Sequence, residues 1–159
     1  MTSINQEIVT LLPGLRRYAC AVTGDRQCGD RYVRIALEIL AEEPWRVRAG
    51  PDVRFCLYRL FDDVLSIFEP GPADEVIEQA DPYHRLKHGV LDLPFLSRKL
   101  LLLVSVERFS LGRAAELLGM PAREAEVHLA GARAQLSSVT AAVREARTEH
   151  STGASGLAA

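Results

Sequence analysis

Hydrophobic residues recur along most of the chain at the three- and four-residue spacing of amphipathic helices. The first such segment covers about 8–19 and ends near 23–25, the second covers about 27–42, and a third follows the break at 49–52 and ends by 68. No stretch shows the alternation that is typical of strands. The pattern therefore predicts an all-α fold.

The pattern continues after residue 83 with a short helix to about 91. The helix predicted next, 95–108, is apolar nearly all round, as expected for the central helix of a small bundle. Ser110 is a natural N-cap, Gly119 a helix end, and Pro121 a first helical position. A last helix starts there and runs to about 146 or past it.

The segment between the two helical groups contains acidic residues and no Lys or Arg up to His84. Its composition predicts a linker, which permits either a compact or an open pair of domains. We predict two small helical domains, 1–68 and 84–146, joined by an acidic linker, 69–83. A Ser-, Thr-, Gly- and Ala-rich tail, 147–159, is expected to be disordered.

Residues 110–133 have the spacing of a helix-turn-helix, in which the second helix of a DNA reader presents basic and amide side chains. This chain instead presents Arg123, Glu124, Glu126 and His128 there. A net charge of −2 and an isoelectric point near 6.1 also argue against a general nucleic-acid binder. The combination suggests a protein that imitates a DNA-binding factor and engages protein instead of DNA.

The sequence shows no pattern that is typical of a catalytic or metal-binding site. Three cysteines have no metal-type spacing and are expected to be reduced and packed. His84 and His88 stand four residues apart without further ligands placed to complete a metal site. We expect no enzyme activity, cofactor or metal. With no apolar run long enough to cross a membrane and no secretion signal, we expect a cytoplasmic protein.

Both domains resemble parts of extracytoplasmic-function sigma factors, together over about 8–137. The first domain resembles their second region and the second domain their fourth, helix-turn-helix region. The motifs that carry the resemblance are Leu15–Ala19, Thr23–Asp25, Gly29–Asp30, Leu93–Pro94, Val106–Ser110, Ala114–Pro121 and Ala132–Arg133. Acidic residues replace basic ones at 124–126 and at 62–63, and Val33 stands where that family has Gln.

With these departures, the chain resembles a narrower family. This family is the sigma-like half of the PhyR-type anti-anti-sigma response regulators of the general stress response. Residues 15–19, 29–33, 57–61 and 106–110 fit its pattern. The resemblance implies sequestration of a NepR-type anti-sigma factor by sigma-factor mimicry, which releases the stress sigma factor without direct DNA binding. The family continues into a receiver domain, a further candidate partner missing from this chain. We expect an excised half or a natural protein without that switch.

Helix-in-groove recognition of the anti-sigma factor is the expected mode. Core packing is the alternative for Leu102 and Val33, and stabilisation of a helix N-terminus is the alternative for Glu124. The wide apolar face of helix 27–42 is favoured to reflect deep packing, with a partner on its far side as the alternative. The candidate partner-binding residues are Asp30, Tyr32, Val33, Leu37, Arg59, Arg98, Leu102, Val106, Phe109, Glu124 and His128.

Two other functions compete. A true sigma factor would bind promoter DNA and core RNA polymerase, and it is favoured by the basic excess within 85–136. A helical scaffold would leave the paired sigma-like domains unexplained. Salt dependence separates the anti-sigma mimic from a true sigma factor. DNA binding weakens steeply as salt rises, whereas a largely apolar complex with an anti-sigma factor should not.

Overall fold

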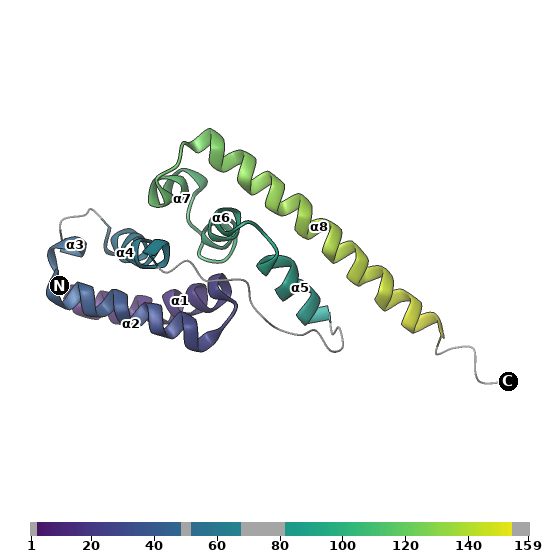
Figure 1. The fold of residues 1–159 in the computed structure, drawn as a ribbon, viewed down its shortest axis with the longest axis horizontal. Coiled ribbons are helices and arrows are strands. Elements are labelled where there is room, and N and C mark those ends of the chain that lie inside the picture. The colour runs from purple at the N-terminus through teal and green to yellow at the C-terminus, as the bar shows by residue number, and fades with distance from the viewer. Residues whose placement is uncertain (1–2, 49–51, 68–81, 154–159) are drawn as a thin grey trace.

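The computed structural model describes residues 3–48, 52–67 and 82–153, and within these ranges every regular element is a helix (Figure 1). The predicted all-α class is therefore confirmed. We call residues 3–67 the first half and residues 82–153 the second half. The predicted linker lies almost entirely outside the described residues. Among the described residues, no helix has both the length and the apolar character needed to cross a membrane.

The first half consists of α1 (Ile4–Thr23), α2 (Arg26–Glu42), the short α3 (Trp45–Arg48) and α4 (Val53–Ile67). The turn between α1 and α2 is set by its residues. Gly24 ends α1 in the left-handed conformation at φ 79°, and the Asp25 carboxylate caps α2 by accepting the Cys28 N–H at 2.7 Å. Gly29 then lets α2 approach α1 closely, since a Cβ there would lie 2.8 Å from the Cys20 nitrogen.

The second half consists of α5 (Pro82–Leu91), α6 (Phe95–Ser105), α7 (Leu111–Leu118) and α8 (Ala122–Gly153). Ser110 caps α7 by accepting the Arg113 N–H, and Gly119 ends it at φ 68°, as the sequence predicts. Helix α8 packs along α7, α6 and α5 and continues past them (Figure 1). It extends to Gly153, so residues 147–153, which the sequence places in a disordered tail, are helical.

One core joins the two halves, because α1 packs on α6 and α4 packs on α7. Tyr18, Tyr58 and Phe61 form an aromatic cluster in the first half. Phe109 of the second half packs against the Tyr58 ring with centroids 5.3 Å apart. Of the two arrangements that the sequence permits, the structure shows the compact one.

Candidate functional site

A buried carboxylate lies at the centre of the interface between the halves. Glu107 follows α6, and only 3% of it is exposed. The Tyr58 hydroxyl donates to its Oε2 at 2.6 Å, and the Arg17 guanidinium donates to its Oε1 at 3.0 Å. Arg54 donates to the Glu107 carbonyl and stacks over the Phe109 ring at 4.2 Å. One acid of the second half thus binds α1 and α4 together.

A second buried pair crosses the same interface. The Lys99 Nζ of α6 lies 2.7 Å from the Asp62 Oδ1 of α4, with side chains 7% and 11% exposed. Burial raises the pKa of the Asp62 carboxyl, and the Lys99 charge opposes that rise. This pair fixes the register of α4 against α6.

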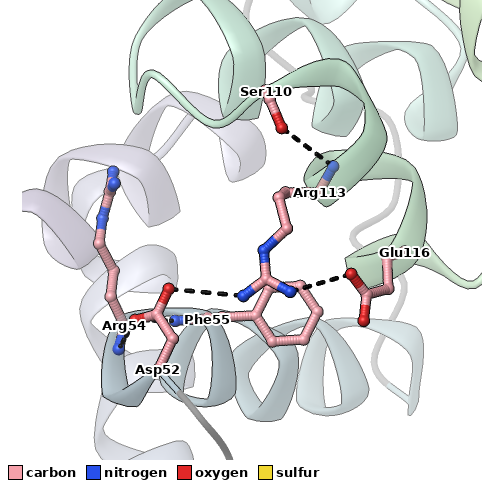
Figure 2. A network of polar contacts seen from close by, with 6 residues as sticks. All are labelled: Asp52, Arg54, Phe55, Ser110, Arg113 and Glu116. Carbon is pink, nitrogen blue, oxygen red and sulfur yellow. Dashed lines mark hydrogen bonds and ion pairs between the residues drawn. The ribbon is translucent and has the colours of Figure 1, made fainter.

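Helices α4 and α7 meet through Arg113, whose guanidinium stacks on the Phe55 ring at 4.0 Å (Figure 2). It is flanked by Asp52 at 3.5 Å and Glu116 at 2.9 Å. Both ion pairs are partly exposed, so the stacking on Phe55 orients the side chain more than the charges do.

Two arginines predicted to bind a partner make contacts within the chain across this interface. Arg98 donates to the Val22 carbonyl at 2.9 Å and also to the Leu91 carbonyl. Arg59 donates to the Glu116 carbonyl at 3.1 Å. In this arrangement both guanidinium groups help to hold the halves together, and their contact with a partner stays a prediction.

A groove of about 680 Å³ opens beside the interface, between the C-terminal half of α1, α5 and the end of α6. Its walls carry apolar side chains from both halves, among them the predicted residues Leu102 and Val106. Leu102 is buried, and Val106 is 38% exposed. The groove is lined by Arg17, Cys20, Ala21, Gly24, Asp25, Arg26, His84, Leu86, Lys87, Val90, Leu91, Leu102 and Val106.

The candidates on α2 do not line this groove. Asp30 forms a bidentate pair with Arg16, at 2.8 and 2.7 Å, and this hydrogen bonding lowers the pKa of the Asp30 carboxyl. Val33 is 4% exposed, whereas Tyr32 and Leu37 are half-buried and pack against the core. The wide apolar face of α2 is therefore explained at Val33 by deep packing.

The remaining candidates lie on α8 and in the turn that precedes α7. Glu124 and His128 form a pair at 3.7 Å, and the His128 Nδ1 lies 2.9 Å from the Ser97 Oγ. Phe109 is 7% exposed and contributes to the core. Buried side chains offer almost no surface, so we assign Val33 and Phe109 to packing.

Sequence reasoning missed Glu107 and the groove residues from α1 and α5. Glu107 had only a weak signal, because the polar pair of Glu107 and Arg108 between Val106 and Phe109 also suits an ordinary exposed turn. Leu86 and Val90 gave no such signal, since the apolar stripe of α5 faces both α8 and the groove.

The geometry defines the class: an all-helical domain whose two halves share one core and are joined by buried polar pairs. Residues 8–62 match the family model of the Sigma2 domain of PhyR. The chain belongs to the family of PhyR-type sigma-like domains.

Individual relatives agree with this assignment. The phyllosphere-induced regulator PhyR of Methylorubrum extorquens is 37% identical over 109 residues, which are 68% of this chain and 39% of that protein. The chain thus spans well under half the length of this curated relative. In the NMR structure of the PhyRSL–NepR complex from Sphingomonas sp. Fr1, the matched chain is 31% identical, with a TM-score of 0.69 and coverage of 86% of this chain and 88% of that one.

A sigma factor shares the architecture. The co-crystal structure of the sigma factor RpoE with the anti-sigma factor NepR from Bartonella quintana matches with a TM-score of 0.71 at 16% identity, covering 86% of this chain and 95% of that one. At this identity the match shows the likeness of fold alone.

Proposed function

We propose that this chain is an anti-anti-sigma factor that sequesters a NepR-type anti-sigma factor by sigma-factor mimicry and so releases a stress sigma factor. The observation that carries the proposal is the match to the PhyRSL–NepR complex over most of both chains. An anti-sigma factor of the same name, NepR, is also bound to the sigma factor RpoE, which has the same fold. A shared shape that meets a shared partner is what mimicry requires.

The surface chemistry supports capture of protein over DNA. On α8, where a DNA reader would meet phosphates, Glu124 and Glu126 are exposed. Their charges oppose the counterion-release gain that drives DNA binding. The acidic pair in the C-terminal half of α4 differs: Asp62 is buried against Lys99, and Asp63 lies 3.4 Å from Arg46. The acidic residues on α8 therefore change the charge of the surface, whereas Asp62 on α4 contributes to the interface between the halves.

Calorimetric titration with a purified NepR-type anti-sigma factor tests the proposal, with core RNA polymerase and promoter duplex titrated alongside. We expect saturable binding of the anti-sigma factor that depends weakly on salt, and none of polymerase or duplex. Binding of polymerase and duplex without the anti-sigma factor would overturn the proposal in favour of a true sigma factor.

A further inference from the structure

A second, smaller hollow of about 270 Å³ lies between α5 and α8. Its polar lining comes from successive turns of α5, where His84, His88 and Asp92 follow one another at four-residue steps. Val139 and Ala142 of α8 form an apolar wall. Of the residues that line the hollow, only His84 also lines the groove beside the interface of the two halves. The hollow is therefore a separate feature of the molecule.

Helix geometry places two imidazole rings side by side in this hollow. Residues four apart on an α-helix lie on the same face, with Cβ atoms about 5–6 Å apart. His84 and His88 both line the hollow, so their side chains lie on one side of α5. His84 is exposed and His88 is half-buried, so an ion can reach both rings from solvent. Two imidazole nitrogens at this spacing can bind one ion at the usual distance of about 2.0–2.1 Å.

Gly89 fixes the rotation of α5 that gives this arrangement. It is buried, and a Cβ at this position would lie 3.2 Å from the Val139 Cγ1 and 3.3 Å from the Leu136 Cδ2. The α5 backbone therefore packs directly on α8 at residue 89. Because His88 is next to this contact in the chain, the packing of α5 on α8 holds it at the hollow. The two histidines are thus carried by a packed helix, which positions ligands more firmly than a loop does.

The chemistry of the lining suits a transition-metal ion. Imidazole nitrogen is a preferred ligand of Zn²⁺, Ni²⁺ and Cu²⁺. No other His, Cys, Asp or Glu within the described residues completes a set of three with the pair, so water fills the remaining positions of a bound ion. Asp92 follows His88 by one turn, which suits a carboxylate that accepts the second N–H of a metal-bound imidazole. Its charge also offsets that of Arg85 in the same hollow.

We propose that His84 and His88 form a two-histidine site for a divalent transition-metal ion such as Zn²⁺, with Asp92 as the residue that orients His88. The proposal is independent of the proposed function, and it departs from the expectation of no metal that the sequence spacing supports. The hollow is the reason, because it brings both rings to one accessible side of a helix that is fixed against α8. A bound ion joins the first two turns of α5 and stabilises the folded chain.

Calorimetric titration of the untagged chain with zinc chloride tests the site, with thermal unfolding at rising zinc concentrations measured alongside. We expect saturable binding of one ion per chain. The unfolding midpoint should rise with the zinc concentration, because the ion binds the native state. In two-dimensional NMR spectra the imidazole signals of His84 and His88 should shift together during the titration.

Variants of the lining locate the ion. His84→Gln and His88→Gln should each weaken zinc binding at least about tenfold, since each removes one of the two protein ligands. His88→Cys should retain binding, because a thiolate is also a zinc ligand. Asp92→Asn should weaken binding about tenfold, as for the loss of an orienting partner. His128→Gln is the matched control, because His128 lies on α8 outside the hollow, and this variant should bind zinc as the wild type does.

The outcomes separate the parts of the proposal. Absence of saturable zinc binding by the wild type overturns the site. Binding that persists in both His84→Gln and His88→Gln, or that is lost as strongly in His128→Gln, overturns its location. Unchanged binding in Asp92→Asn overturns the orienting role of Asp92. Circular dichroism confirms that each variant is folded, and the titration with the anti-sigma factor tests the proposed function separately.

Discussion

Lys99 and Asp62, which come from opposite halves of the chain, lie 2.7 Å apart with both side chains almost withdrawn from solvent. A buried ion pair gains little net stability, but removal of one member leaves an uncompensated charge in the core. Their pairing is therefore a specific requirement of the compact arrangement.

The Lys99→Met variant is expected to lose about 3 kcal/mol of unfolding free energy, because Asp62 stays buried without its partner. The double variant Lys99→Met with Asp62→Leu should recover to within about 1 kcal/mol of the wild type, since an apolar pair needs no compensation. Urea unfolding of the four proteins in the cycle measures this coupling. Additive losses would contradict it.

The raised pKa of Asp62 gives a pH dependence with a definite sign. A native-state value above the ordinary 3.8 means that the folded protein holds this proton more tightly than the unfolded chain. The group therefore favours folding below pH 3.8, and this contribution is lost as the pH rises through the raised value. Relative to Asp62→Asn, the wild type should lose unfolding free energy over that rise, as urea titrations at successive pH values would measure. An opposite slope would show that Lys99 dominates the Asp62 site.

Tyr58→Phe removes the hydroxyl that donates to the buried Glu107 carboxylate. We expect a loss of about 2 kcal/mol in unfolding free energy, as for a hydrogen bond to a charged group. Tyr18→Phe is the matched control, because the buried Tyr18 hydroxyl has no hydrogen-bond partner within the described part of the chain. Its removal should be neutral or stabilising. Equal losses in the two variants would show that ring packing, not the hydrogen bond, matters at Tyr58.

Gly24→Ala should destabilise the protein by about 2 kcal/mol, because residue 24 has a positive φ and a new Cβ would lie 2.8 Å from the Leu91 Cδ2. Gly131→Ala, in the interior of α8 with nothing near its Cβ position, should instead stabilise by about 0.5–1 kcal/mol. Thermal unfolding of both variants checks the contrast. A neutral Gly24→Ala would mean that α1 and α5 separate easily at this end of the groove.

The sequence predicted the helices because their signals are local. The caps at Ser110 and Gly119 and the break at Gly24 follow from single residues and their immediate neighbours. The compact arrangement could not be predicted, because it depends on contacts such as Lys99–Asp62 and Tyr58–Glu107 between residues far apart in the chain.

Whether the candidate residues bind a partner stays a prediction, but their surroundings depend on distant contacts in the same way. Leu102 and Val106 do line the groove, but their apolar character alone did not distinguish a groove from a core. Arg59 and Arg98 were predicted from their charge to meet a partner, and the structure directs both to backbone carbonyls of the chain itself. Their acceptors lie in other helices or turns, so no local pattern could reveal them.

The shared position of Glu107 among α1, α4 and α6 has a consequence for how the molecule opens. A half that detached would break the contacts of this carboxylate and expose the core that both halves share, so the halves are expected to unfold together. The slowest-exchanging amides of α1, α4 and α6 should therefore exchange together, as one cooperative unit, in native-state hydrogen exchange.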